Sequence, residues 1–128
     1  MQLASLTIHE VAEGLRSKKF SSQELTKSCL ERIKKYNPQL NSYVTLTEQS
    51  ALKQAREADQ RIQKNENLSP LTGVPCALKD VFCVDGVRTT ACSNVIKNFE
   101  PPYDATTVRK LKEAGMVLLG KTNTDEFT

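Results

Sequence analysis

The stretch DATTVRKLKEAGMVLLGKT, residues 104–122, joins the two kinds of secondary structure on which the fold of this chain depends. Apolar residues recur at helical spacing from Ala105, and Asp104 before them has a side chain that commonly caps a helix N-terminus. Gly115 stands where a left-handed C-cap is expected, and Met116–Leu119 is a short apolar run typical of a buried strand. The stretch therefore predicts a helix that leads directly into a core strand.

An upstream stretch, LTGVPCALKDVF at residues 71–82, predicts a second strand. Turn residues precede a short apolar run there, so Cys76–Leu78 is expected to be buried in a sheet. The two strands and the helix between them indicate a β-α-β unit. One such unit leaves a bare sheet edge and an uncovered face, so we expect residues 1–128 to belong to a larger α/β fold that is incomplete at residue 128. Thr124–Glu126 is expected to begin the next helix.

Helices are expected to precede the sheet, so that residues 1–70 form a helical segment and residues 71–128 the start of an α/β core. Two of them open with capping boxes, of the forms T-x-x-E and S-x-x-E, and the second should end at a proline. The expected segments are a helix over Thr7–Lys18, a helix from Ser21 to Asn37-Pro38, an extended stretch over Tyr43–Leu46 and a helix over Glu48–Lys64.

Composition is that of a soluble globular domain: of 128 residues, 38% are hydrophobic and 26% charged. The net charge of +3 is too small to argue nucleic-acid binding, and the densest basic group, Arg32, Lys34 and Lys35, is better explained as a solvated helix end than as a nucleic-acid contact. The N-terminus has no signal-peptide pattern, and nowhere do eighteen apolar residues follow one another. We therefore expect a cytoplasmic protein with no membrane association.

Cysteine and histidine spacing does not indicate a metal site. The four cysteines form no C-x-x-C pair and the single histidine is remote from them, which disfavours both zinc and a disulfide framework. Reduced, mostly buried thiols are the simpler interpretation. These residues are Cys29, Cys76, Cys83, Cys92 and His9.

One motif match is expected to be false. Gly115–Thr122 satisfies the phosphate-loop pattern G-x-x-x-x-G-K-[ST]. A phosphate loop needs its strand before the first glycine and an open polar turn between the two glycines. Here four large apolar residues fill that interval and are themselves the predicted strand, so nucleotide binding is disfavoured.

Lys79 is the candidate for chemistry. It ends a predicted buried strand, and poorly solvated surroundings would favour the neutral form that lets a lysine act as a base. From residue type alone, a surface lysine or one that pairs with Asp80 would be the more common case.

The surrounding sequence changes that balance, because five blocks in order resemble the amidase-signature family. They cover a G-x-P-x-x-x-K-D segment, a Thr-rich turn, and P-x-Y-D-A, L-x-x-A-G and G-K-T-N-x-D-E-F motifs. In this chain the blocks are GVPCALKD (73–80), GVRTTACS (86–93), PPYDAT (101–106), LKEAG (111–115) and GKTNTDEF (120–127). Within the family, the N-terminal third is most similar to the A subunits of glutamyl-tRNA(Gln) or aspartyl-tRNA(Asn) amidotransferases.

The resemblance implies a Ser, cis-Ser, Lys triad in which Lys79 is the lysine. Family members carry both serines in a later Gly- and Ser-rich segment, so this chain alone is expected to be inactive. Thr89, Thr90, Ser93 and Thr122 match no family nucleophile and are expected to be turn and capping residues. The chain departs from the family pattern at Val81 and Thr128, where Asn and Ala are common, and neither departure touches Lys79.

For an A subunit the resemblance further implies a glutaminase that passes ammonia to a B subunit for amidation of misacylated tRNA, with a small C subunit in the complex. ATP and magnesium would act at the B subunit, and no cofactor or metal is expected on this segment. Two alternatives stay open: a fragment of a stand-alone amidase that hydrolyses other amides, and a non-catalytic interaction module. Use of tRNA(Gln) or tRNA(Asn) also stays open.

Overall fold

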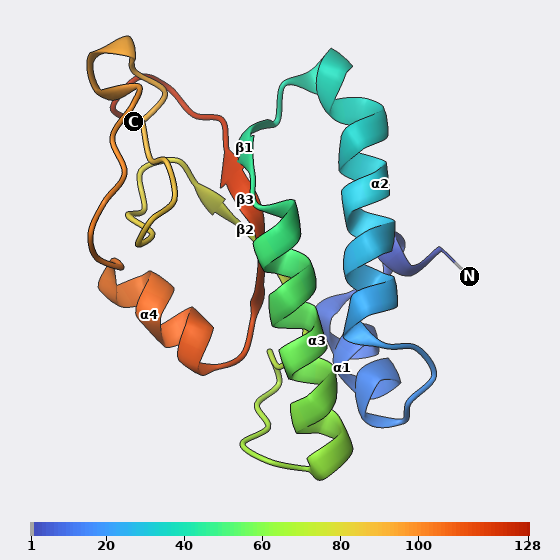
Figure 1. The fold of residues 1–128 in the computed structure, drawn as a ribbon. Coiled ribbons are helices and arrows are strands. Elements are labelled where there is room, and N and C mark those ends of the chain that lie inside the picture. The colour runs from blue at the N-terminus through green and yellow to red at the C-terminus, as the bar shows by residue number, and fades with distance from the viewer. Residues whose placement is uncertain (1) are drawn as a thin grey trace.

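A computed structural model describes residues 2–128. A small central sheet lies between a layer of two helices, α2 (Ser22–Leu40) and α3 (Glu48–Lys64), and a single helix, α4 (Thr106–Glu113), on the other side (Figure 1). The elements are η1 (Leu3–Ser5), α1 (Ile8–Arg16), α2 (Ser22–Leu40), β1 (Tyr43–Leu46), α3 (Glu48–Lys64), β2 (Pro75–Lys79), η2 (Asn94–Ile96), α4 (Thr106–Glu113) and β3 (Val117–Thr122). The predicted α/β class, with helices before a β-α-β unit, is confirmed.

The sheet has the strand order β1-β3-β2 and is mixed. β2 and β3 are parallel, with Pro75 beside Val117 and Lys79 beside Thr122, and α4 makes the crossover between them. β1 pairs antiparallel with the other edge of β3. The β-α-β prediction is therefore correct, and the stretch expected only to be extended is a third strand.

Strand β3 forms the centre of the core because its alternate residues face both helical layers. Val117 and Leu119 pack with Ala51 and Ala55 of α3, whose small side chains let the helix lie close to the sheet. On the opposite face Leu118 packs in a second cluster. The buried members of that cluster are Leu78, Val84, Val108, Met116 and Leu118.

Both capping boxes are present, and the predicted helix starts are correct. Thr7 accepts a hydrogen bond from the N–H of Glu10 while its own N–H donates to the Glu10 carboxylate, and Ser21 and Glu24 do the same at the start of α2. The two helices bring a third cluster together, in which Val11, Leu15, Phe20, Leu25 and Val74 are buried.

The predicted end of α2 at Asn37-Pro38 is wrong, because the helix runs on to Leu40 with Pro38 inside its last turn. A proline there removes only one backbone hydrogen bond near a helix end. Asn41 then closes the helix in the left-handed conformation, and the Asn37 side chain exchanges hydrogen bonds with the backbone of Tyr43 at 2.8 and 3.1 Å. The turn into β1 thus determines where α2 ends.

The predicted N-cap of α4 is also wrong. Ala105 occupies the cap position, while the Asp104 carboxylate accepts the N–H of Asp85 at 2.9 Å and pairs with Lys112 at 2.8 Å. Gly115 does have the predicted left-handed conformation, with φ of 84°.

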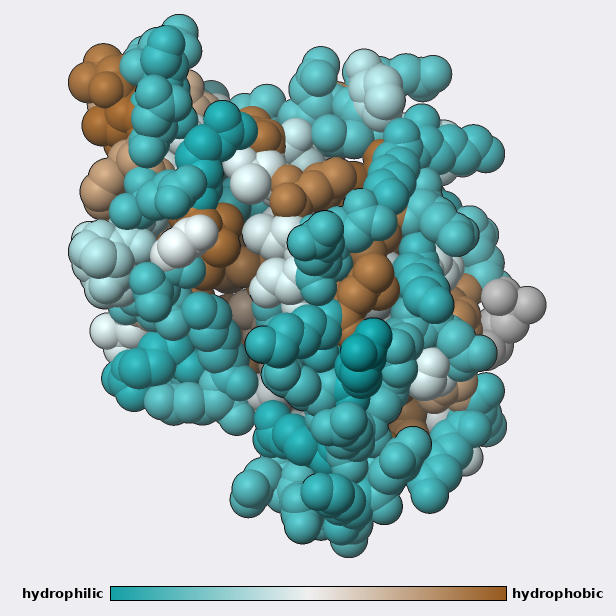
Figure 2. Space-filling model, in the orientation of Figure 1, coloured by the Kyte–Doolittle hydropathy of each residue, from teal (hydrophilic) through white to brown (hydrophobic). Residues whose placement is uncertain are grey.

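The segment after β3 forms a bend and a turn at residues 125–127, so the helix expected from Thr124 is not seen within residues 123–128. No helix within residues 2–128 has the length and apolar character needed to cross a bilayer. Polar side chains cover most of the face drawn in Figure 2, and hydrophobic residues show on it only in scattered groups.

Candidate active site

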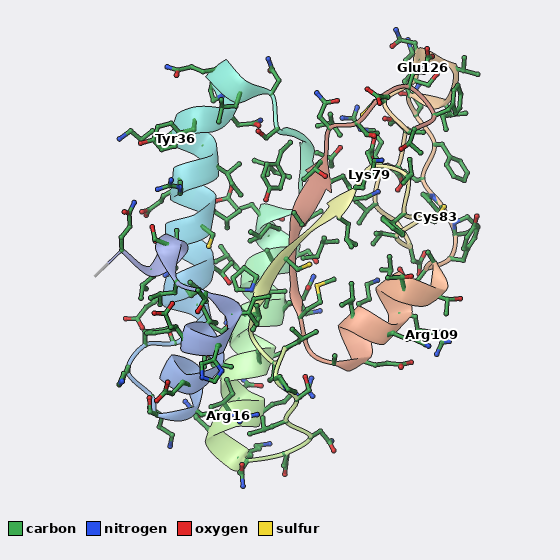
Figure 3. All side chains as sticks on the ribbon, turned by 180° about the vertical axis from the view of Figure 1, so that it is seen from behind. Arg16, Tyr36, Lys79, Cys83, Arg109 and Glu126 are labelled. Atoms are coloured by element: carbon green, nitrogen blue, oxygen red, sulfur yellow. The ribbon has the colours of Figure 1, made fainter. Side chains whose placement is uncertain are left out.

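Lys79 is the last residue of β2, and its side chain is exposed. Figure 3 shows it at the tip of the strand, where the chain leaves the sheet for the loops that carry Cys83 and Glu126. Its Nζ donates a hydrogen bond to Oγ1 of Thr128. The poorly solvated surroundings expected for Lys79 are not formed by residues 2–128.

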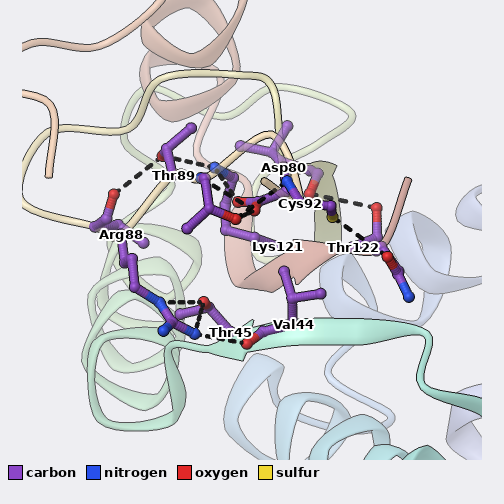
Figure 4. A network of polar contacts seen from close by, with 12 residues as sticks. Val44, Thr45, Asp80, Arg88, Thr89, Cys92, Lys121 and Thr122 are labelled. Atoms are coloured by element: carbon purple, nitrogen blue, oxygen red, sulfur yellow. Dashed lines mark hydrogen bonds and ion pairs between the residues drawn. The ribbon is translucent and has the colours of Figure 1, made fainter. Parts of the chain in front are cut away.

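Asp80, the next residue, is fully buried. It does not form the pair with Lys79 that residue type alone would favour. Its Oδ1 lies 3.3 Å from Nζ of Lys121, and its Oδ2 accepts both the backbone N–H of Thr90, at 3.1 Å, and the Thr90 hydroxyl (Figure 4). Asp80 therefore pairs with a lysine of the neighbouring strand and leaves Lys79 free of it.

Lys121 was not predicted to have a role at the site, although it lies in the GKTNTDEF block that resembles the family. It lies fully buried in β3, and its Nζ also donates to Oγ1 of Thr89 at 2.8 Å. Burial lowers the pKa of Lys121, and the charge of Asp80 opposes that effect. The sequence held no signal that separates the two lysines, because Lys79 also follows an apolar strand run and is exposed.

The phosphate-loop match at Gly115–Thr122, which was expected to be false, does not form such a loop in the structure. Gly120 and Lys121 lie inside β3 and are paired with β1 on one side and β2 on the other. A segment paired on both sides in a sheet presents no open turn of N–H groups to a phosphate.

A loop over residues 89–93 closes around Asp80. Ala91 and Cys92 are both in the left-handed region, with φ of 47° and 51°, which costs free energy for residues other than glycine. The Ala91 N–H donates to the Asp80 carbonyl at 2.9 Å, and the Cys92 N–H donates to the Thr90 hydroxyl at 3.1 Å. The contacts to Asp80 and Thr90 thus hold a strained loop beside the end of β2.

The hydroxyl residues expected in turns and caps have different roles, and the expectation is wrong for Thr122, which is paired within β3. Ser93 caps η2 by accepting the Val95 N–H at 3.2 Å, as expected of a capping residue, and donates to Glu126 at 2.7 Å. Thr89 and Thr90 are more than turn residues, because they bind the two members of the buried ion pair.

Metal-ligating side chains are not clustered among residues 2–128: no group of three His, Cys, Asp or Glu is placed to hold an ion. The four cysteines are free and half-buried, rather than mostly buried as expected. Burial raises the pKa of the Cys29 and Cys76 thiols, which favours the unreactive thiol form.

Comparison with known proteins identifies the class. The amidase family model matches residues 24–128. Among solved structures, the peptide amidase of Stenotrophomonas maltophilia superposes with a TM-score of 0.91 and 33% identity over 97% of this chain and 26% of that one. An amidase family protein of Bacillus anthracis superposes with a TM-score of 0.86 and 32% identity over 97% of this chain and 25% of that one. The chain belongs to the amidase-signature family.

Curated relatives are more similar still. The A subunit of the glutamyl-tRNA(Gln) amidotransferase of Pseudomonas entomophila is 57% identical over 95% of this chain, and that of Geobacter sp. strain M21 is 51% identical over 99%. The chain spans about a quarter of the length of these relatives, 25% and 26% respectively.

Proposed function

We propose that this chain is the N-terminal part of the glutamine-hydrolysing, ammonia-supplying A subunit of a tRNA-dependent amidotransferase. The observation that carries the proposal is the difference in identity: 51–57% to amidotransferase A subunits, against 33% to the peptide amidase with the same local fold. A fragment of a stand-alone amidase is the alternative, and the lower identity to such enzymes counts against it.

The proposed catalytic residue is Lys79, acting as the base of a Ser, cis-Ser, Lys triad. Its side chain extends from the end of β2 and is exposed, so it is free to meet serines that another segment supplies. Through the bridging serine it would take the proton of the nucleophilic serine, whose oxygen attacks the amide carbonyl. Ammonia leaves with that proton, and water then releases the acid from the acyl-enzyme.

In this proposal glutamine is the amide substrate, and the ammonia passes to a B subunit that converts Glu-tRNA(Gln) to Gln-tRNA(Gln). A C subunit completes the complex, and ATP and magnesium act at the B subunit. No residue of this chain is assigned to either of them.

Substrate preference tests the proposal. Residues 1–128 are extended with the downstream three quarters of an amidotransferase A subunit, combined with B and C subunits, and offered glutamine or a C-terminal peptide amide. Ammonia release from glutamine, and its transfer to Glu-tRNA(Gln), is the expected result. Hydrolysis of the peptide amide alone would indicate the stand-alone amidase, and a folded complex that cleaves neither would indicate a non-catalytic module.

A further inference from the structure

The buried ion pair between Asp80 and Lys121 is the feature that the proposed chemistry does not use. Both side chains are fully buried, so neither can reach a substrate. Burying two charges costs desolvation free energy, and well-packed apolar residues often give equal or greater stability. Stability alone is therefore a weak reason for an ion pair here. The position of the pair next to Lys79 suggests a second reason.

The pair lies one residue from Lys79 and joins three segments at that point. The Asp80 N–H donates to the Thr122 carbonyl of β3 at 3.0 Å, and the Asp80 carbonyl accepts the Ala91 N–H at 2.9 Å. The carboxylate adds the contacts to Thr90 and to Lys121. Every polar group of Asp80 is thus fixed by β3 or by the loop over residues 89–93.

That loop is itself anchored to the rest of the sheet. Arg88, just before it, donates to the Val44 carbonyl at 3.0 Å and to the Thr45 hydroxyl at 3.2 Å, both in β1 (Figure 4). The Phe127 N–H donates to the Ala91 carbonyl at 3.0 Å, which brings the segment after β3 to the same place. A change at Asp80 would therefore be transmitted to β3 and to the loop over residues 89–93, which both contact the chain directly after Lys79.

We propose that Asp80, Lys121 and Thr90 are positioning residues, which fix the end of β2 so that Nζ of Lys79 is held in line with its reaction partners. This inference rests on the proposed function of Lys79. Misplacement of a catalytic group by about 1 Å can cost on the order of a hundredfold in rate, so loss of the carboxylate contacts acts mainly on kcat.

The test uses the extended chain described above and measures kcat and KM for glutamine together with thermal stability. Asp80→Asn and Thr90→Val each remove one part of the contact, and both are expected to lower kcat at least about tenfold with KM changed less than about twofold. Thr90→Ser keeps the hydroxyl and is expected to rescue kcat relative to Thr90→Val. Lys121→Met with Asp80→Asn removes both charges and tests the pair without leaving one ion unpaired.

Asp104→Asn is the matched control, because Asp104 also pairs with a lysine, Lys112, but lies at the start of α4. It is expected to lower stability without altering kcat. If Asp80→Asn and Thr90→Val lower stability but leave the kcat of the folded protein unchanged, the pair is structural only and the inference is overturned. Failure of the proposed function is seen separately, as retained activity in Lys79→Ala.

Discussion

Glu10 and Glu24 show how single residues set the start of a helix. The backbone and side-chain hydrogen bonds from Thr7 lower the pKa of Glu10, and those from Ser21 lower the pKa of Glu24. A carboxyl whose pKa is lower in the folded state stabilises the fold above its unfolded pKa of 4.5, and that contribution is lost as the pH falls through the folded pKa.

We therefore expect a Glu10→Gln, Glu24→Gln double variant to lose less stability than the parent chain on acidification below about pH 4.5. Glutamine keeps the capping geometry but does not titrate. Urea unfolding between neutral pH and pH 3 measures the difference, with Glu13→Gln, outside any capping box, as the control. Parallel pH profiles for the double variant and the parent would contradict the expectation.

Gly120 shows how closely two elements can approach. A Cβ at this position would lie 2.2 Å from the Thr45 carbonyl oxygen and 3.1 Å from Cα of Leu46, both backbone atoms of β1. Since backbone cannot move aside as a flexible side chain can, any larger residue forces β1 away from β3.

Gly120→Ala is accordingly expected to lower the free energy of unfolding by about 1–3 kcal/mol or more, measured by chemical denaturation. Gly86→Ala is the comparison, because Gly86 has φ of 65° with nothing within 4 Å of an added Cβ and so reports left-handed strain alone. Equal losses for the two variants would show that the contact with β1 is not the cause.

Elements were predicted from the sequence where local chemistry fixes them. Capping boxes indicated the starts of α1 and α2, and Gly115 indicated the end of α4. Tertiary contacts determined the other helix ends. Asn37 binds the Tyr43 backbone, so α2 continues beyond Pro38. Lys112 and Asp85 bind the Asp104 carboxylate, which therefore does not cap α4. Lys79 is proposed from its motif, whereas Lys121 acquires its partner only when the fold brings it to Asp80, 41 residues away in the chain.

In the whole molecule, β3 is the middle strand and belongs to both hydrophobic clusters that face the sheet. If the helical layer on one face of the sheet opens, the layer on the other face still covers β3. Exchange of the β3 amide hydrogens with solvent is therefore expected to require global unfolding. Hydrogen exchange is expected to be slowest at Val117–Leu119 and fastest at η1 and residues 123–128. Slower hydrogen exchange at the amides of α4 than at those of β3 would contradict this description of the core.

The assignment of Lys79 as the base of an amidase-signature triad is decided by the glutaminase activity of the extended chain. Lys79→Ala is compared with Lys53→Ala, which removes an exposed lysine from α3, after circular dichroism has shown both variants to be folded. We predict a fall in kcat of at least about a thousandfold for Lys79→Ala and no change for Lys53→Ala. Unchanged activity in a folded Lys79→Ala variant would refute the assignment and remove Lys79 from the site.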